Sequence, residues 1–193
     1  MNILWIIVSY LIGSIPFALI VGKLFKNIDV REFGSGNLGG TNAIRVLGPK
    51  LGIPAGVLDI SKAFVVVLLA RLGVIDFEFS PLYLGVIASV GHCYPIFANF
   101  KGGKAVSTSI GTMLAFSPVI ALISAAIAFA VIKVTKYVSV GSTAFGSVII
   151  ISFLITGNKT AILPSVLLLL FIMFRHIPNY KRLFSGTESK AKL

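Results

Sequence analysis

A glycine-rich segment, residues 34–45, contains the residue types best suited to bind an anion. It reads GSGNLGGTNAIR, and its four glycines tolerate positive φ and allow close approach to the backbone. Successive N–H groups of such a segment can point into one concavity, and an arginine can grip phosphoryl oxygens with two parallel bonds. A flexible linker, the alternative, needs neither the arginine nor the two asparagines. The candidate anion-binding residues are Gly34, Ser35, Gly36, Asn37, Gly39, Thr41, Asn42 and Arg45.

A second segment, residues 91–104, ends in two glycines and a lysine where an apolar helix is expected to begin. Free N–H groups and the positive end of the helix dipole face a ligand at such a position, so Lys101, Gly102, Gly103 and Lys104 are candidates for anion binding. The spacing is not that of a Walker loop. The lysines could instead anchor the chain at the membrane surface or hold lipid headgroups, an alternative that suits Lys101 better than Lys104.

Two further polar segments lie at the ends of apolar runs. Ser139 and Ser142 are one helical turn apart, although serines of membrane helices often serve packing instead. After the last apolar run, His176, Asn179 and Glu188 stand among basic residues. A basic anchor next to the membrane does not require these three, so His176 and Asn179 are candidate site residues, and we expect a structural or field-tuning role for Glu188.

A charged pair interrupts an otherwise apolar run. Asp59 and Lys62 are three residues apart, which places them on one helical face. Charges inside a membrane are costly unless they are paired or hydrated. We therefore expect a structural pair that also tunes the field of the site, and we expect a structural role for His92. The single cysteine, Cys93, offers no disulfide or zinc cluster, so we predict neither a metal nor another cofactor.

Long apolar runs separate these segments. Of the 193 residues, 56% are hydrophobic and 12% charged, and the mean hydropathy is +1.00, which indicates an integral membrane protein. The net charge of +11 is not gathered into the arm or stripe that nucleic-acid binding requires. A membrane-spanning helix needs about 20 residues. We predict an all-α polytopic bundle with clear spans at residues 4–21, 53–72, 82–97, 138–155 and 161–174.

Residues 104–134 could form one long kinked helix or two antiparallel helices that meet at Ser117-Pro118, a favourable helix start. Because basic residues accumulate in cytoplasmic loops, their distribution distinguishes the one-helix from the two-helix topology. One helix gives six spans and eight basic residues on each side. Two helices give seven spans and leave only Arg71 and Lys159 outside. We therefore predict seven spans, with the N-terminus outside and the C-terminus cytoplasmic. The basic residues then inside are Lys23, Lys26, Arg31, Arg45, Lys50, Lys101, Lys104, Lys133, Lys136, Arg175, Lys181, Arg182, Lys190 and Lys192.

Taken together and in this order, the polar segments resemble those of the PlsY family, the bacterial acyl-phosphate:glycerol-3-phosphate acyltransferases. The resemblance covers nearly the whole chain, with Ala105, Ser107 and Pro178 as small departures; glycine is expected at 105 and alanine at 107. The matching residues are the GSxNxGxTN segment with Arg45, Gly91-His92, Pro95, Phe100 through Lys104, Ser139, Ser142, Arg175-His176, Asn179, Arg182, Gly186 and Glu188.

The resemblance implies one acyltransferase domain, residues 1–193, on the cytoplasmic face of the bacterial inner membrane. Its substrates would be acyl phosphate and glycerol 3-phosphate, and its products 1-acylglycerol 3-phosphate (lysophosphatidic acid) and inorganic phosphate, in the first acylation step of phospholipid synthesis. It also implies contact with membrane lipid and a functional link to an enzyme that forms acyl phosphate. The chain itself lacks the His-x4-Asp pattern of thioester-using acyltransferases, since Phe97 follows His92 and Lys181 follows His176 at that spacing.

For the mechanism, we expect Ser35, Arg45, Lys104 and His176 to be the catalytic residues. The glycine-rich segment would cradle phosphate, Arg45 and Lys104 would neutralise charge, and Ser142, His176 and Asn179 would orient glycerol 3-phosphate. The base could be His176 or the phosphate of glycerol 3-phosphate itself, and we favour the latter. The competing functions are transport of a phosphorylated solute and lipid binding by a scaffold. No internal repeat of the transporter kind is visible.

Overall fold

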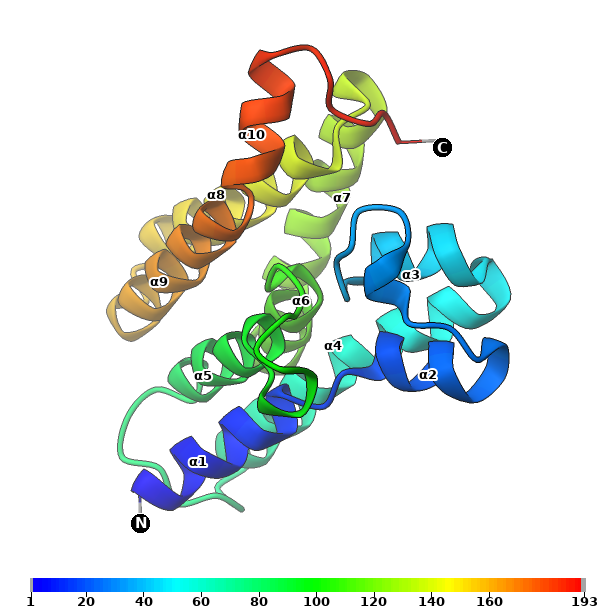
Figure 1. Cartoon of the computed structure of the whole chain (residues 1–193). Coiled ribbons are helices and arrows are strands. Elements are labelled where there is room, and N and C mark those ends of the chain that lie inside the picture. Colours follow the sequence, from blue (N-terminus) through cyan, green and yellow to red (C-terminus); the bar gives the residue numbers. More distant parts are fainter. Residues whose placement is uncertain (1, 192–193) are drawn as a thin grey trace. The chain divides into compact units, whose positions relative to one another are not determined.

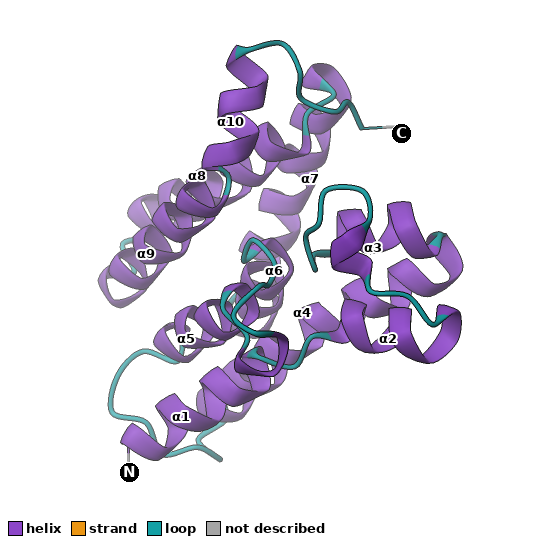
Figure 2. Ribbon diagram, in the orientation of Figure 1, coloured by secondary structure: helices purple, strands orange, loops and turns teal. Residues whose placement is uncertain are grey.

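The computed structural model describes residues 2–191, so Lys192 lies outside the described part. Within that part the regular structure is helical, without strands, as predicted (Figure 2). The elements are α1 (Asn2–Gly13), α2 (Phe17–Lys26), η1 (Val30–Glu32), α3 (Gly40–Leu47), α4 (Pro49–Arg71), α5 (Leu82–Cys93), η2 (Ile96–Ala98), α6 (Val106–Phe116), α7 (Pro118–Thr135), α8 (Val138–Thr156), α9 (Lys159–Arg175) and α10 (Ile177–Phe184), where η denotes a 3-10 helix (Figure 1).

The chain divides into two compact units, Met1–Phe116 (unit 1) and Ser117–Leu193 (unit 2). Unit 1 holds the glycine-rich segment and the segment that ends in Lys104. Unit 2 holds the two serines and the residues after the last apolar run. That the whole chain acts as one domain stays a prediction.

Four helices of the described chain are long and apolar enough to cross a membrane. They are α1 and α2 taken together, α4, α7 and α8. A fifth candidate combines α9 with α10, which are bent by 54°. The remaining two of the seven predicted spans form shorter apolar helices, Leu82–Ala98 and Val106–Phe116. The structure therefore supports four or five spans by length and composition, and the remaining spans and the orientation stay predictions.

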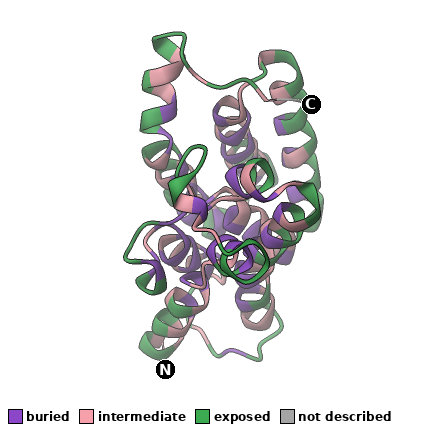
Figure 3. Ribbon diagram, turned by 45° about the vertical axis from the view of Figure 1, so that its right-hand side comes forward, coloured by how far each residue is buried: buried purple, intermediate pink, exposed green. Residues whose placement is uncertain are grey.

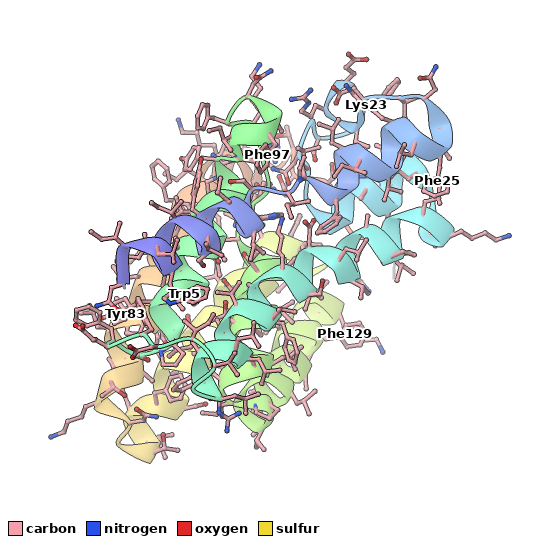
Figure 4. The ribbon with its side chains drawn as sticks, turned by 90° about the horizontal axis from the view of Figure 1, so that it is seen from below. Trp5, Lys23, Phe25, Tyr83, Phe97 and Phe129 are labelled. Atoms are coloured by element: carbon pink, nitrogen blue, oxygen red, sulfur yellow. The ribbon has the colours of Figure 1, made fainter. Side chains whose placement is uncertain are left out.

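The predicted first span is divided in two at Pro16. Proline has no N–H and disrupts the helical hydrogen bonds around it. The amides of Leu19 and Ile20 instead both donate to the Pro16 carbonyl, at 3.0 Å each. The chain thus starts a second helix, α2, whose exposed side chains include Phe25 at the edge of unit 1 (Figure 4).

The predicted start of a helix at Ser117-Pro118 is confirmed. Helix α6 ends at Phe116, and α7 begins at Pro118, where φ of proline is already helical. Ser117 has φ −146° and ψ 88°, outside the helical region, but its side chain forms no capping hydrogen bond. The long stretch is therefore two helices.

Small residues let the helices of unit 1 approach closely, as is common in membranes. Ser9 on α1 donates a 2.6 Å hydrogen bond to the Leu84 carbonyl of α5. A methyl group on Gly91 would collide with the Tyr10 carbonyl, and one on Gly111 would collide with the Ile60 carbonyl. These contacts join α1 to α5 and α4 to α6.

Helices α4 and α6 run side by side in the same direction and end together. The Arg71 guanidinium donates a 3.0 Å hydrogen bond to the Ala115 carbonyl, one of the last carbonyls of α6. Arg71 is one of the two basic residues predicted to lie outside. Its hydrogen bond to the end of α6 gives it a structural role there. Helix α6 has 11 residues and α4 has 23, so α6 lies along only part of α4.

In unit 2, α8 packs against α7 and α9. Beyond α10 the chain turns back, and the Ala191 amide donates a 2.7 Å hydrogen bond to the Lys136 carbonyl at the α7–α8 turn (Figure 1). Apolar side chains such as Val119, Leu122 and Phe129 are more than half exposed on α7, and Phe129 points outward (Figure 4). Exposed residues lie along the outer faces of the helices (Figure 3), as expected for a chain surrounded by lipid.

Candidate functional site

The glycine-rich segment is held in shape by the side chain of Asn42. Its Oδ1 accepts the Ser35 amide at 2.9 Å, and its Nδ2 lies 3.2 Å from the carbonyls of Val30 and Phe33 and 3.0 Å from that of Asn37. Asn42 is only 2% exposed. The side chain is fully used inside the loop, so the structure favours a supporting role for it over the predicted contact with substrate.

Glycine is required at Gly34 for two reasons. Its φ is +62°, a value that residues with a Cβ rarely adopt, and a methyl group there would collide with Asn42 Oδ1. Gly36 also has positive φ, +68°. The predicted positive φ of this segment is confirmed at both positions.

The polar groups on the outer side of this segment remain available. Ser35, Thr41 and Arg45 are exposed, and within residues 2–191 their side chains form no hydrogen bond or ion pair. Arg45 lies in the last turn of α3, whose first residue is Gly40. These three side chains can therefore contact a ligand without breaking an existing interaction.

The second segment is tied to the first by Asn37. The Asn37 amide Nδ2 donates to the Gly102 carbonyl at 2.9 Å, while its Oδ1 accepts the Gly39 amide at 2.8 Å. Lys104 follows two residues later and is half-buried. The structure thus brings the two predicted anion-binding segments of unit 1 together.

Gly102 and Gly103 allow close packing on His92. The Gly103 amide donates to the His92 carbonyl at 2.9 Å. A methyl group on Gly103 would collide with His92 Nε2, and one on Gly102 with the His92 carbonyl. Because they have no side chains, Gly102 and Gly103 allow the loop to pack against His92. We had not expected this packing role from the sequence.

Two helix N-termini meet beside these segments. A Cβ added to Gly40, the first residue of α3, would lie 4.0 Å from Ser107 Oγ in the first turn of α6 and 3.6 Å from Gly56 Cα on α4. Each N-terminus carries a partial positive charge and free N–H groups. Together with Arg45 and Lys104 they make this part of unit 1 electropositive. The start of α3 at Gly40 was not expected from the sequence.

An ion pair anchors the chain just before the glycine-rich segment. Arg31 contacts Asp29 at 2.6 Å and also donates to the Ala98 carbonyl of η2 at 3.0 Å. The hydrogen bond from Arg31 holds the pKa of the Asp29 carboxyl below its usual value and raises the pKa of Arg31. The chain just before the glycine-rich segment is therefore tied to the middle of the second segment, in addition to the link through Asn37.

The departures from the family pattern have local explanations. Ala105, where a glycine is expected, has φ +65° and is fully buried, so this alanine holds a strained backbone. Pro178 lies in the first turn of α10, where proline is favourable. Nothing in the structure explains the serine at position 107.

In unit 2 the site residues lie at the ends of three helices. Ser139 and Ser142 are buried in the first turns of α8, where Ser142 donates to the Val138 carbonyl at 2.9 Å. Ser139 Oγ has no partner within residues 2–191. His176, 3% exposed, lies between α9 and α10 with Nδ1 2.8 Å from the Ile172 carbonyl. A carbonyl only accepts, so Nδ1 carries a proton and Nε2 is the other ring nitrogen.

Glu188 connects the C-terminal segment to α10. Its Oε1 accepts from Asn179 Nδ2 at 2.6 Å, and its Oε2 accepts from Arg182 Nε at 2.7 Å. A residue that sequence reasoning missed, Tyr180, places its hydroxyl 2.6 Å from Thr143 Oγ1 and so joins α10 to α8. The carboxylate thereby holds Asn179, which agrees with the predicted supporting role of Glu188.

The predicted pairing of Asp59 and Lys62 is present in the structure. Lys62 Nζ lies 2.7 Å from Asp59 Oδ1, and both residues are buried. His92 Nδ1 on α5 lies 3.6 Å from the same oxygen. Among residues 2–191, no group of three or more His, Cys, Asp or Glu side chains is arranged to hold a metal ion.

Comparison with known proteins gives one consistent answer. The family model described as glycerol-3-phosphate acyltransferase matches residues 3–186. Glycerol-3-phosphate acyltransferase 3 of Bacillus anthracis is 45% identical, over 96% of this chain and 92% of that protein. Glycerol-3-phosphate acyltransferase of Staphylococcus carnosus (strain TM300) is 41% identical, over 100% of this chain and 98% of that protein.

Two crystal structures of PlsY (YgiH), an integral membrane glycerol 3-phosphate acyltransferase, are also similar. The glycerol 3-phosphate form has a TM-score of 0.93 and 33% identity, covering 99% of this chain and 96% of that one. The lysophosphatidic acid form has a TM-score of 0.90 and 32% identity, covering 99% and 95%. The chain therefore belongs to the glycerol-3-phosphate acyltransferase family and has the fold of the integral membrane enzyme PlsY.

Proposed function

We propose that the chain transfers an acyl group from acyl phosphate to the 1-hydroxyl of glycerol 3-phosphate. The observation that carries this proposal is the joined pair of segments in unit 1, where Asn37 links the glycine-rich segment to Gly102 beside two helix N-termini. Phosphate is the group that such N–H groups and cations suit best. Both proposed substrates are phosphorylated, and glycerol 3-phosphate is named for one of the similar crystal structures.

The residues of unit 1 would bind and neutralise phosphate. Gly34, Gly36 and Gly39 would let a phosphate approach the backbone closely. Because the amides of Ser35, Gly36 and Gly39 already donate within the segment, the N–H groups at the start of α3 would form the cradle, with Ser35 and Thr41 as side-chain donors. Arg45 and Lys104 supply positive charge, and the exposed Lys101 adds to the positive electrostatic potential around the two segments. Asn37, Asn42, Gly102 and Gly103 hold the two segments in shape.

The residues of unit 2 would orient the acceptor. Ser139 Oγ is unpartnered within the described chain, and Ser142, His176 and Asn179 are the other candidates for contact with glycerol 3-phosphate. Glu188 keeps Asn179 in place through the 2.6 Å hydrogen bond. That the residues of the two units serve one pocket stays a prediction from the sequence.

In the reaction, the acceptor oxygen attacks the acyl carbonyl carbon and the acyl–phosphate bond breaks. The hydroxyl proton must leave, and the products are 1-acylglycerol 3-phosphate and inorganic phosphate. Acyl phosphate is already activated, so no nucleophile from the protein is needed. We assign the proton to the phosphate of glycerol 3-phosphate, the alternative favoured by the sequence, which leaves the protein to position the substrates and stabilise charge.

The cellular setting follows from the charge pattern. Seven spans with an outside N-terminus place all four polar segments on the basic, cytoplasmic side of the bacterial inner membrane. The acyl chain would lie in lipid or between helices. An enzyme that makes acyl phosphate would supply the donor and is the expected functional partner.

The test is turnover of the purified protein in detergent. Phosphate release is measured from acyl phosphate with and without glycerol 3-phosphate, and in a separate arm acyl-CoA replaces acyl phosphate. The proposal predicts release only when both phosphorylated substrates are present, with no product from acyl-CoA. Product from acyl-CoA alone would overturn the proposed donor. A transporter would show no glycerol-3-phosphate-dependent release.

A further inference from the structure

A buried charge cluster in unit 1 connects three parts of the chain. Besides contacting Asp59, Lys62 Nζ donates to the Ile15 carbonyl at 2.9 Å, in the break between α1 and α2, and lies 5.8 Å from the centre of the Phe17 ring. The same Asp59 oxygen faces His92 on α5. The cluster therefore joins the α1–α2 break, α4 and α5.

The carboxylate of Asp59 is incompletely satisfied. Oδ1 is shared between the ammonium and the imidazole, whereas Oδ2 is buried and has no hydrogen-bond partner within residues 2–191. A buried, unpaired carboxylate oxygen is costly, and a packed apolar pair is often equally stable or more so. Stability alone therefore does not account for a charged side chain here.

His92 is the member of the cluster that contacts the second anion-binding segment. Its ring nitrogen Nε2 occupies the space that a side chain on Gly103 would need, and its carbonyl accepts the Gly103 amide at 2.9 Å. From the other side, Asn37 holds the Gly102 carbonyl at 2.9 Å. The two glycines are thus fixed between His92 and Asn37, immediately before Lys104.

We propose that Asp59 is a positioning residue for phosphate binding: it orients the His92 ring, which fixes Gly102 and Gly103 and so places Lys104. Asp59 itself touches no substrate. The ligand concerned is a phosphate group, either that of glycerol 3-phosphate or that of the acyl donor, whose stand-in is inorganic phosphate. The inference rests on the role of Lys104 in the proposed function.

The experiment is a double-mutant cycle on the full chain in detergent, with Asp59→Asn, His92→Gln and the double variant. Dissociation constants for glycerol 3-phosphate and for inorganic phosphate are measured by calorimetry. We expect each single variant to weaken binding of at least one ligand about tenfold, since small misplacements of a binding group have effects of this size or larger. Because Asp59 acts through His92, the double variant should bind no more weakly than the more affected single variant.

A control separates positioning from general stability. Ser9→Ala removes a buried hydrogen bond between α1 and α5 but touches neither segment of the site. It should lower the Tm while leaving both dissociation constants within twofold of the wild-type values. If Asp59→Asn does not fold, Asp59→Glu, which keeps the negative charge beside Lys62 but moves the carboxylate relative to His92, takes its place in the cycle.

Two outcomes would overturn the inference. One is that folded Asp59→Asn or His92→Gln binds both ligands within twofold of the wild-type protein. The other is that the effects of the two substitutions multiply in the double variant. Because no acyl donor is present in these measurements, failure of the acyl-phosphate reaction is distinguished from failure of this inference.

Discussion

In unit 1 the groups proposed to bind an anion include backbone N–H groups at the start of α3, on a loop shaped by glycines, whereas in unit 2 they are side chains at the ends of α8, α9 and α10. The asparagines of unit 1 are turned inward: Asn42 forms four hydrogen bonds within its own loop. In unit 2, Asn179 lies at the end of a chain of side-chain contacts through Glu188 to Arg182. A site made of backbone groups depends on glycines, and a site made of side chains depends on the residues that hold them.

This difference predicts where each unit is vulnerable. In unit 1, a methyl group in the wrong place should be as damaging as loss of a charge. In unit 2, loss of one side chain should reduce activity in steps, because several side chains share the work. The following variants test the comparison, beginning with the largest effect.

Arg45→Ala should have the greatest effect. It removes the exposed guanidinium of unit 1 that has no partner within residues 2–191. We expect kcat/KM to fall by about 10²–10³-fold, the usual effect of removing one group that stabilises transition-state charge. Lys50→Ala, which removes an exposed charge from α4, is the control and should stay within twofold. A loss of less than tenfold for Arg45→Ala would contradict the assigned role.

Gly34→Ala should come next. The added methyl group meets Asn42 Oδ1 and the residue must hold φ +62°, so the hydrogen bond from the Ser35 amide to Asn42 Oδ1 should break. We expect kcat/KM to fall by roughly 10²-fold, as for a small displacement of a binding group. Gly48→Ala has the same kind of positive φ, +81°, but open space around it. Its ψ of 166° lies in a region that only glycine adopts readily, so this variant should lose about 1–3 kcal/mol of stability and keep its kinetics. Equal losses of activity in both variants would argue against a backbone-built site.

His176→Ala tests unit 2. If the substrate phosphate takes the proton, the variant loses orientation of the acceptor but not the base. The kcat at saturating substrates should then fall by less than about 10²-fold, which is the lower end of the contribution of a general base. A larger fall, with folding intact by thermal unfolding, would assign the proton transfer to His176.

Glu188→Gln should have a smaller effect. The amide cannot accept from both Asn179 and Arg182 as a carboxylate does, so Asn179 should become less well placed. We expect KM for glycerol 3-phosphate to rise several-fold, corresponding to about 1 kcal/mol for a weakened hydrogen bond. Ser185→Ala, on the exposed turn nearby, is the control and should be neutral. An unchanged KM would show that Asn179 is held without Glu188.

Ala105→Gly should produce the smallest change and the only gain. Glycine relieves the strain of φ +65°, about 1 kcal/mol or more, but adds about half as much unfolded-state entropy. The expected net gain is roughly 0.5 kcal/mol, seen as a rise in Tm of about 1–2 °C for a chain of this size. A lower Tm would mean that the alanine methyl group contributes more by packing than its backbone costs.

Much of this arrangement could be predicted from local sequence. Apolar runs and the Ser117-Pro118 pair predicted the helices, and the glycines at 34 and 36 predicted positive φ. What could not be predicted depends on contacts between distant residues. His92 is 33 positions from Asp59, and Asn37 is 65 positions from Gly102, so neither periodicity nor composition reveals that they meet. Proline at position 16 is a known helix breaker, but the apolar run on both sides of it led to the prediction of one continuous span.

The most direct test is to determine on which side of the membrane the proposed site residues of each unit lie. Single cysteines at Arg45 and at Lys181, an exposed residue five positions after buried His176, are introduced in a Cys93→Ala background and treated with an impermeant maleimide. The account predicts that both react in inverted vesicles and that neither reacts in intact spheroplasts, while a cysteine at Lys159 shows the reverse. Labelling of positions 45 and 181 from opposite sides would contradict it, since the two units could not then act on the same substrates.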